Sequence, residues 1–222
     1  MLITYHGHAE FLLETANGRR ILFDPYDEKA GYPMKRVRAD AVLVSHHHFD
    51  HDYVDKVDGK PVVIDQKGAH KLLEGVRVTG FPSFHDDKKG AQRGQILCHL
   101  VEADGLKVAH LGDLGIVPDE GLKSSLFMPD ILFIPVGGFF TIDAAQARET
   151  IDLLKPRVAI PMHYRNDKGG FDRISTLAPF LDAMKPLQAS FQPILRVTQG
   201  DLSQQPRLVV LDIQPEVPRA DS

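Results

Sequence analysis

The chain has 222 residues, of which 43% are hydrophobic and 25% charged, and its formal net charge is -4. These values are ordinary for a globular protein, and the length is enough for one domain with a sizeable core. Lys and Arg form no long run, so nucleic acid is not a favoured partner. The chain has no obvious signal peptide and no apolar run near the ~18 residues that cross a bilayer. A lone cysteine permits no internal disulfide. We therefore expect a cytoplasmic protein, and its oligomeric state is unknown.

Short apolar runs separated by turn residues dominate the first half and predict β-strands. An Asn-Gly pair between the runs 11–15 and 20–24 predicts a hairpin. The run 41–45 is almost continuously apolar, which is typical of a strand covered on both faces. Residues 66–75 end on a glycine and predict a helix. Further strands are predicted at 1–5, 61–65, 76–80, 95–103 and 106–113.

Helices alternate with strands in the second half. Residues 141–156 form the clearest predicted helix, because apolar side chains line one side, Thr141 or Asp143 can cap it, and a proline ends it. Other predicted elements are a helix at 172–186 and strands at 130–137, 157–164 and 206–213. This order predicts one α/β domain, residues 1–213, with two sheets and helices outside them. Residues 214–222 are expected to be a flexible tail.

Residues 45–52 read SHHHFDHD and follow directly on the predicted strand 41–45. The segment is either a polar surface loop, a histidine-rich sequestering tract, or a spaced set of metal ligands. Imidazole nitrogens and carboxylate oxygens are ligands that zinc and similar metals prefer, and loops at strand ends often carry sites. A metal site needs partners elsewhere, and His85, Asp113 and His163 each follow an apolar run. Their joint occurrence favours the metal site.

The segment SHHHFDH resembles the H-x-H-x-D-H motif of the metallo-β-lactamase-fold hydrolases. His85, the HLGD sequence at Asp113 and the IPMHY sequence at His163 follow in that family's order. ITYHGHAEFLLET near the start and the stretch 135–164 resemble a branch that contains ascorbate-phosphate lactonase-like proteins. The resemblance covers residues 1–165 and implies an α/β fold built as a four-layer αββα sandwich. It also implies a site at one edge, between the two sheets.

The resemblance further implies that seven side chains hold two divalent metal ions. These side chains are His46, His48 and His85 for the first metal, Asp50, His51 and His163 for the second, and Asp113 as a bridge. Asp24 would orient one of the ligands. Zinc is the expected metal, and manganese, iron or nickel are alternatives.

Two divalent ions roughly 3.5–4 Å apart lower the pKa of a shared water from about 15.7 to about 7 and so supply hydroxide at neutral pH. We therefore predict a metal-dependent hydrolase that cleaves a small ester, lactone or phosphodiester without a covalent intermediate. Asp50 and Asp113 are the predicted catalytic residues, and Asp50 could also take a proton from the nucleophile. One alternative is a nuclease or phosphodiesterase of the same fold. The other is a non-hydrolytic metal-binding or oxidoreductase protein. A small-molecule substrate is the expected partner, and no membrane is expected.

The remaining histidines are predicted to lie outside the ligand set. His47 should point away from the metals, His70 should be solvated on a helix, and His99 should lie on a strand surface. His110 is predicted to be structural. For His8, support of a ligand and simple packing both stay open.

Three other features bear on the substrate. Residues 137–140, GGFF, could form a lid, a pocket wall or part of the core. Arg165 follows a predicted ligand closely and either binds an anionic substrate group or is an ordinary surface residue. Gln95 stands where relatives often have asparagine, which puts a strict carry-over of lactonase activity in doubt.

Overall fold

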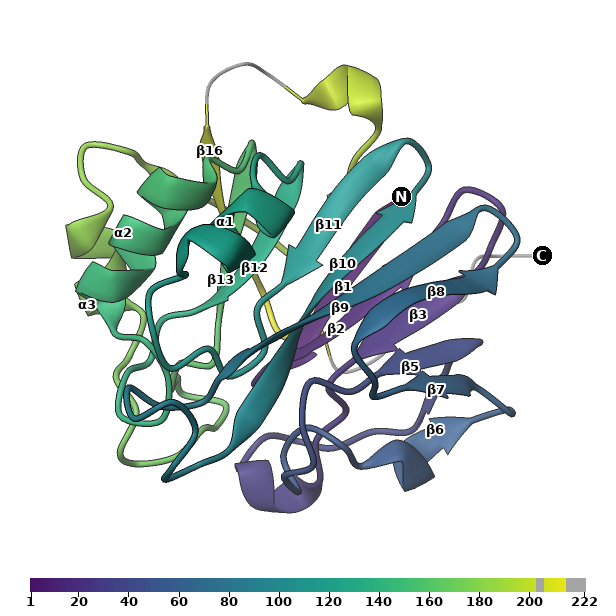
Figure 1. Cartoon of the computed structure of the whole chain (residues 1–222), viewed down its shortest axis with the longest axis horizontal. Helices are drawn as coiled ribbons and strands as arrows, with labels where there is room; N and C mark the ends of the chain where they lie inside the picture. Colours follow the sequence, from purple (N-terminus) through teal and green to yellow (C-terminus); the bar gives the residue numbers. More distant parts are fainter. Residues whose placement is uncertain (203–205, 215–222) are drawn as a thin grey trace.

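The computed structural model describes residues 1–202 and 206–214. Figure 1 shows two large β-sheets and, on one side of them, a group of α-helices. The six-stranded sheet has the order β15-β1-β2-β3-β5-β7. Its strands are β1 (Leu2–Gly7), β2 (Glu10–Glu14), β3 (Arg20–Phe23), β5 (Ala41–Leu43), β7 (Val62–Ile64) and β15 (Ile194–Arg196).

The second sheet has eight strands in the order β14-β16-β13-β12-β11-β10-β9-β8. They are β8 (Gly68–Leu73), β9 (Val76–Phe84), β10 (Gln95–Ala103), β11 (Leu106–His110), β12 (Ile131–Pro135), β13 (Val158–Met162), β14 (Ala189–Gln192) and β16 (Arg207–Leu211). A small sheet pairs β4 (Val37–Arg38) with β6 (Val57–Asp58). The helices are α1 (Glu120–Leu126), α2 (Ala144–Leu154) and α3 (Ala178–Ala183). Three 3-10 turns, η1 to η3, cover Glu28–Ala30, Val54–Lys56 and Gln199–Asp201.

Strand β5 of the first sheet is apolar at every position because both of its faces are covered. On β5, Ala41 and Leu43 join the main core, whereas Val42 joins a second cluster on the opposite face. On β3, Phe23 joins the main core and Leu22 joins the second cluster. Side chains of a strand alternate between its faces, so a continuous apolar run predicts two buried faces. That prediction for 41–45 is confirmed.

The main core lies between the two large sheets. Phe11 on β2 stacks on Phe133 of β12, with ring centroids 4.0 Å apart and an interplanar angle of 8°. Phe23 on β3 stacks on His110 of β11, with centroids 4.9 Å apart. These cross-sheet contacts bury large aromatic areas and fix how the two sheets face each other.

The predicted helix 141–156 is confirmed as α2, and its cap is Asp143. The Asp143 side chain accepts hydrogen bonds from the backbone N–H groups of Ala145 and Gln146, and the Gln146 side chain accepts one from the Asp143 N–H. This capping box satisfies donors that a helix start would otherwise leave unpaired. Lys155 ends the helix in the left-handed conformation, immediately before a proline.

Two helix predictions need correction. Residues 66–75 are not helical, because Gly68–Leu73 pairs antiparallel with β9 as the edge strand β8 and Gly75 lies in the turn between them. Within the predicted helix 172–186, only Ala178–Ala183 is α-helical. The hairpin at the Asn-Gly pair is confirmed, since β2 and β3 pair antiparallel from Phe11 to Glu14.

The outer layers of the sandwich differ from each other. The three α-helices lie together beside β12 and β13 (Figure 1). The outward face of the six-stranded sheet is covered instead by apolar side chains from residues 37–57, in and around β4, η2 and β6. Among the described residues this second outer layer contains no α-helix. The α/β sandwich is otherwise as predicted.

Strand direction determines where the candidate site residues meet. In the first sheet β1, β3 and β5 run in one direction, because β1 and β3 both pair antiparallel with β2 while β3 and β5 are parallel. In the second sheet β9, β11, β12 and β13 share a direction for the same reasons. The candidate residues follow the carboxyl ends of these strands, at Asp24, 45–52, His85, Asp113 and His163. Ligand sites commonly form at such an edge.

Among the described residues, no helix has the length and apolar character that a bilayer crossing requires. The cytoplasmic location and the single domain 1–213 stay predictions. Of the predicted tail 214–222, only Gln214 lies within the described residues, and its backbone N–H donates to the carbonyl of Tyr5.

Candidate metal centre

The structure brings all seven predicted ligands together, although they come from four separate loops. Their nitrogen and oxygen atoms fall into three overlapping groups, and within each group one atom per residue lies within 4.8 Å of the others. The groups are His46, His48 and His85; His46, His51 and Asp113; and His8, Asp50, His51 and His163. The first group is the set predicted for one metal. The third group contains Asp50, His51 and His163, the set predicted for the second metal, together with His8.

His46 and His48 lie side by side at the opening of the centre. Nε2 of His46 is 3.0 Å from Nδ1 of His48, and the His85 ring centroid lies 4.8 Å from that of His46. His48 is solvent-exposed, whereas His46 and His85 are buried. The three imidazoles therefore converge on one point that remains open to solvent through His48.

Asp113 lies between the groups. Its Oδ1 atom is 3.1 Å from Nε2 of His51, and its Oδ2 atom is 3.3 Å from Nε2 of His163 and 3.4 Å from Nε2 of His85. The two carboxylate oxygens thus face histidines of both predicted metal positions. This arrangement is the one expected for a bridging carboxylate.

His8 is the residue that sequence reasoning left undecided. Its Nε2 atom lies 3.1 Å from Oδ2 of Asp50, its ring is fully buried, and its ring centroid is 4.3 Å from that of His163. Its backbone is left-handed, with φ of 52°, and its carbonyl accepts hydrogen bonds from the N–H of His163 and the hydroxyl of Tyr5. His8 therefore makes a polar contact to a predicted ligand in addition to packing.

Asp24 orients two of the histidines. Its carboxylate accepts hydrogen bonds from the backbone N–H and hydroxyl of Ser45, each 2.7 Å long, and from Nδ1–H of His51 at 2.9 Å. Since the Ser45 hydroxyl donates to Asp24, its oxygen accepts from Nδ1–H of His46 at 2.9 Å. Both imidazoles are thereby held at Nδ1, with Nε2 directed into the centre.

Burial and the neighbouring charges set the protonation states of the buried groups. Burial by itself would lower the pKa of His51, but the carboxylates of Asp113 and Asp50 raise it well above its usual value, so a metal would have to displace a proton there. Burial lowers the pKa of His46 to about 2 and that of His8 to about 4, so both rings are neutral. Burial alone would raise the pKa of Asp113, but His163 and His51 hold it well below its usual range. Neutral imidazole and ionised carboxylate are the forms that coordinate a metal.

Several buried atoms of the centre lack a hydrogen-bond partner, and this is the direct test of whether a metal fits. They include Nε2 of His51, Nε2 of His163 and Oδ1 of Asp113. The pair His51 Nε2 and Asp113 Oδ1 is close but does not form a hydrogen bond. Leaving such a buried group unpaired costs about 1–3 kcal/mol. A divalent cation satisfies them together, so the donor set fits a metal.

Two glycines allow the loop after β11 to approach the other loops closely. A Cβ atom at Gly112 would lie 2.7 Å from Cβ of Ser45. A Cβ atom at Gly115 would overlap the backbone of His85 and Asp86. Glycine is required at such close backbone approaches. The sequence GDLG therefore places Asp113 between the loops that carry His46 and His85.

The other histidines follow the predictions only in part. His47 points away as expected, because it is exposed and pairs with Asp52 at 3.2 Å. His110 is structural: its Nε2–H donates to the carbonyl of Ala9, and its Nδ1 accepts from the N–H of Gly112. His70 lies on strand β8 rather than on a helix and is partly buried.

The prediction that His99 lies on a strand surface is wrong. His99 is fully buried and directly opposite His110, and paired residues of adjacent strands point to the same face. It therefore faces the first sheet. Burial lowers its pKa to about 4. The alternation pattern around His99 could not reveal that both faces of β10 are covered.

Sequence reasoning missed a buried ion pair beside the centre. Lys56 and Glu10 form a salt bridge with both side chains almost fully buried, and Nζ of Lys56 lies 3.9 Å from the ring centroid of Tyr26. Glu10 also accepts from the backbone N–H of Tyr26 and lies 2.9 Å from Nδ1 of His6. Because Glu10 begins β2, this cluster fixes the turn that carries His8.

Three features noted in the sequence lie at or near the surface. Arg165 is exposed, and its backbone N–H donates to the carbonyl of Ser175. Gln95 is exposed at the start of β10, opposite Phe84. In GGFF, Phe139 is 52% exposed, so this segment is not simply part of the core.

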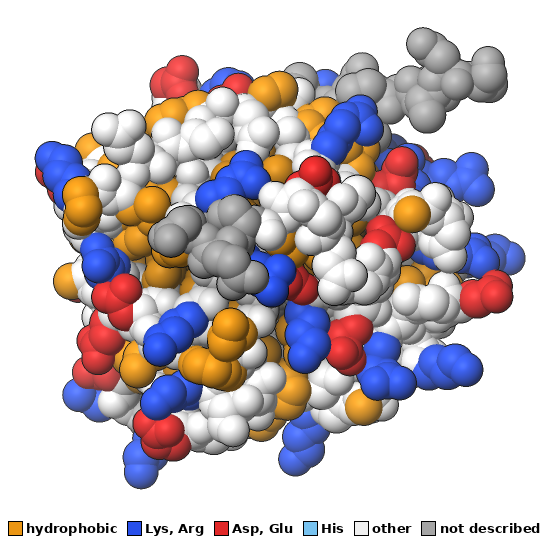
Figure 2. Space-filling view, turned by 90° about the horizontal axis from the view of Figure 1, so that it is seen from above, with side chains coloured by type: hydrophobic (Ala, Val, Ile, Leu, Met, Phe, Trp, Pro, Cys, Tyr) orange, Lys and Arg blue, Asp and Glu red, His pale blue; other side chains and the backbone are white. Residues whose placement is uncertain are grey.

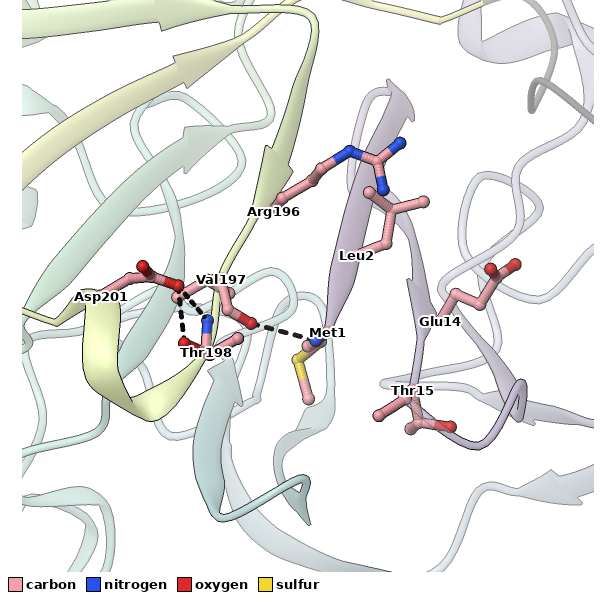
Figure 3. Close-up of a pocket in the computed structure, with 9 residues that line it drawn as sticks. Met1, Leu2, Glu14, Thr15, Arg196, Val197, Thr198 and Asp201 are labelled. Atoms are coloured by element: carbon pink, nitrogen blue, oxygen red, sulfur yellow. Dashed lines mark hydrogen bonds between the residues drawn. The ribbon is translucent and has the colours of Figure 1, made fainter. Parts of the chain in front are cut away.

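A cavity of about 490 Å³ lies at the start of β1, and Figure 3 shows the residues that line it. Met1 and Leu2 line it from the start of β1, and Arg196, Val197 and Asp201 line the other side. The centre lies beyond the opposite end of β1, next to His8. The cavity is therefore separate from the candidate metal centre.

Comparison with known proteins places this geometry in a family. Residues 2–163 match the sequence model of the Beta-lactamase superfamily domain. The chain is 33% identical over 192 residues to a UPF0173 metal-dependent hydrolase of Thermofilum pendens, which covers 73% of this chain and 82% of that protein. It is 31% identical over 194 residues to a UPF0173 metal-dependent hydrolase of Archaeoglobus fulgidus, covering 74% of this chain and 83% of the relative.

A solved structure agrees with the sequence relatives. The crystal structure of a proposed Zn-dependent hydrolase of the metallo-beta-lactamase superfamily from Thermotoga maritima superimposes with a TM-score of 0.78. It is 34% identical and covers 96% of this chain and 99% of its own. The lactonase-like branch stays a prediction. The match to the superfamily model, the relatives and the His/Asp cluster together establish that this chain belongs to the UPF0173 metal-dependent hydrolases of the metallo-β-lactamase superfamily.

Proposed function

We propose that this hydrolase uses two divalent ions, both zinc, to cleave an ester, lactone or phosphodiester bond in a small molecule. One observation carries the proposal. Buried imidazole nitrogens and a carboxylate oxygen converge from four loops without hydrogen-bond partners of their own. His and Asp ligands of this kind suit zinc.

The roles of the ligands follow from the groups that they form. His46, His48 and His85 would hold one ion, and Asp50, His51 and His163 the other, with Asp113 between them. Bound divalent ions at such a site lower the pKa of a water molecule and polarise the oxygen of the bond to be cleaved. Asp24, acting directly and through Ser45, keeps two of the imidazoles in the tautomer that can coordinate.

Asp50 accepts the proton that the attacking water loses. Its Oδ2 atom is 3.7 Å from Nε2 of His51 and receives a hydrogen bond from Nε2–H of His8. Because that nitrogen of His8 is engaged with the carboxylate, we assign His8 to holding Asp50 in place rather than to metal coordination. No serine or cysteine nucleophile is needed, and Cys98 is fully buried.

A small substrate is also in accord with the surface. On the face seen in Figure 2, Lys and Arg side chains are interspersed with Asp, Glu and apolar side chains. A polyanion such as nucleic acid is normally bound by a concentrated basic surface. This face therefore carries no concentrated basic patch of the kind that binds a polyanion.

The first experiment is elemental analysis of metal per chain on protein purified without a histidine tag. We expect about two equivalents in the wild type, the number that a two-metal site holds, and a sharp fall in His48→Ala. His47→Ala is the matched control, because it removes an imidazole from the same loop that points away from the centre. It should leave the metal content unchanged.

The second step is hydrolysis of p-nitrophenyl acetate, a γ-lactone and bis-p-nitrophenyl phosphate with the metal that was found. His48→Ala should lower turnover at least 100-fold, whereas His47→Ala should not. Wild-type protein that retains no metal after incubation with zinc or manganese would overturn the two-metal site. Protein that is fully loaded but cleaves none of the three compounds would overturn the proposed bond types.

A further inference from the structure

Four phenylalanine side chains form a continuous surface beside the metal centre. Phe171 lies edge-on to the ring of His8, with centroids 5.5 Å apart, and also contacts Phe49 at 6.2 Å and Phe140 at 5.8 Å. Phe140 in turn contacts Phe139 at 4.6 Å. We call Phe49, Phe139, Phe140 and Phe171 the aromatic wall. It starts at a buried histidine of the centre and reaches the solvent.

The aromatic wall is exposed where an ordinary core would be covered. Phe49 is 46% and Phe139 52% exposed. Phe139 also has a left-handed backbone, with φ of 58°, which costs a non-glycine residue about 1–2 kcal/mol. Exposed apolar surface at a strained position beside a catalytic centre is typical of a ligand site.

The loops that carry the wall are held together before any ligand binds. Gly137 packs so closely on the carbonyl of His163 that a Cβ atom there would overlap it. The carbonyl of Gly137 accepts from the N–H of Ser175, and the Ser175 carbonyl accepts from the N–H of Arg165. The wall is therefore preorganised, which lowers the entropy lost on binding.

Two arginines stand over the outer rings of the wall. The Arg93 guanidinium carbon lies 5.6 Å from the ring centroid of Phe140, and that of Arg173 lies 5.0 Å from the centroid of Phe139. Within residues 1–202 and 206–214, neither guanidinium has a carboxylate partner within salt-bridge distance. Stacked guanidinium groups keep their N–H edges available, and these edges match carboxylate, sulfonate or phosphate groups.

From this geometry we infer the class of substrate, an inference that rests on the proposed hydrolytic function. The substrate is a small molecule whose planar apolar part lies on the aromatic wall and whose anionic group is bound by Arg93 and Arg173. Its cleavable bond is then placed towards His8 and the metal centre, because Phe171 joins the wall to that side.

Two fluorescent probes test the inference without requiring turnover. 1-Anilinonaphthalene-8-sulfonate carries aromatic rings and an anionic group, and N-phenyl-1-naphthylamine has the same rings without the sulfonate. Both would be titrated into the metal-loaded protein, which has no tryptophan to interfere. The double variant Arg93→Gln/Arg173→Gln should lower the affinity for the sulfonate about tenfold, the effect of losing charge-assisted hydrogen bonds, and leave that for the neutral probe unchanged.

Variants of the wall complete the test. Phe139→Ala and Phe140→Ala should each lower the affinity for both probes about fivefold, because the aromatic contact is lost. Phe127→Ala is the matched control: Phe127 is 46% exposed and has a cation, Lys155, 6.0 Å from its ring centroid, but it lies at the end of α1. Phe139 is exposed, so its variant should fold normally even if Phe140→Ala does not.

Three results would overturn the inference. The first is a loss of probe affinity in Phe127→Ala equal to that in the wall variants. The second is an affinity for the sulfonate probe that is unchanged in the double arginine variant. The third is binding of the sulfonate probe that is lost when the metal is chelated but persists in the double arginine variant. The last would mean that the sulfonate sits on the metals. None of these results depends on hydrolysis. A failure of the proposed reaction is therefore recognised separately: the metal-loaded protein would bind the probes but cleave no substrate.

Discussion

Asp24 orients residues of the centre, although it is not in the predicted ligand set. The carboxylate lies behind the centre, fully buried, and accepts hydrogen bonds from Ser45 and His51. Burial by itself would raise its pKa, but His51 and the other nearby histidines lower it below the usual range, so Asp24 stays ionised. An ionised carboxylate behind a histidine fixes the ring and raises its basicity as a ligand.

Replacement of Asp24 by asparagine should therefore weaken metal binding without removing a ligand. We expect a 10- to 100-fold loss of metal affinity, about the effect of removing such a supporting contact. Competition with a chromophoric chelator measures it. Asp119→Asn, which alters a carboxylate that caps α1, serves as the control and should bind metal normally. Equal metal affinity in Asp24→Asn and wild type would refute the orienting role.

At the scale of secondary-structure elements, the loop after β9 and the loop after β11 pack tightly against each other. The loop after β9 carries His85, and the loop between β11 and α1 carries Gly115, whose backbone N–H donates to the carbonyl of Phe84. The two backbones pack so closely that a Cβ atom at 115 would overlap that of His85 and Asp86. The position of His85 therefore depends on a residue outside the predicted ligand set.

Gly115→Ala should displace His85 and reduce both stability and metal content. We expect a loss of about 1–3 kcal/mol in the free energy of unfolding, as for other overpacked sites, and less than two metals per chain. Urea denaturation and elemental analysis measure these quantities. Gly121→Ala within α1 is the control, where alanine favours the helix. Normal metal content in Gly115→Ala would show that the loops adjust without moving His85.

The buried pair of Glu10 and Lys56 joins the start of β2 to η2. Burial alone would raise the pKa of Glu10, but Lys56 and His6 hold it below the usual range. A carboxyl group whose pKa is lowered by folding stabilises the fold at pH values above its unfolded-state pKa of about 4.3. This stabilisation is lost as the pH falls through the folded-state pKa. At pH 7 the pair therefore contributes fully.

Lys56→Met should leave Glu10 buried without its cation. We expect a loss of about 3–5 kcal/mol at pH 7, because breaking a buried pair leaves an uncompensated charge. The loss should shrink towards pH 5, since the unpaired Glu10 then has a raised pKa and becomes neutral by protonation. Urea denaturation at both pH values measures it, and Glu10→Gln/Lys56→Met should recover stability at pH 7. An equal loss at both pH values would contradict this account.

At the scale of the whole molecule, the metal centre connects the two sheets. Its residues follow β1, β3 and β5 in one sheet and β9, β11 and β13 in the other. A cation bound by residues from both sheets stabilises the native state, because the unfolded chain does not hold these groups together. Metal binding and the stability of the sandwich should therefore be coupled.

Chelation should lower the melting temperature of the wild type. A ligand at about 1,000 times its Kd adds about 4 kcal/mol, and for a chain of this size about 1 kcal/mol corresponds to 2–4 °C. Circular dichroism with and without EDTA should thus show a decrease of about 10 °C. His48→Ala should respond much less. A wild-type melting temperature that chelation leaves unchanged would contradict this coupling.

The sequence by itself determined the features that depend on neighbouring residues. The apolar run at 41–45 predicted two buried faces, Asp143 predicted the start of α2, and SHHHFDH predicted a histidine cluster. In each case the determining groups lie within a few residues of one another. His85, Asp113 and His163 each follow an apolar run, and the resemblance to the metallo-β-lactamase family implied them as ligands. The structure brings them to one edge, because strands of one direction end there.

Only the tertiary structure decided the features that depend on distant residues. Pairing with β9 made 68–73 a strand although its residues permit a helix, and the facing sheet buried His99. The aromatic wall and the pair of Glu10 with Lys56 likewise join loops far apart in the chain. The physical reason is that side-chain burial and charge pairing depend on which surfaces pack together, and a local pattern holds no information on the partner surface.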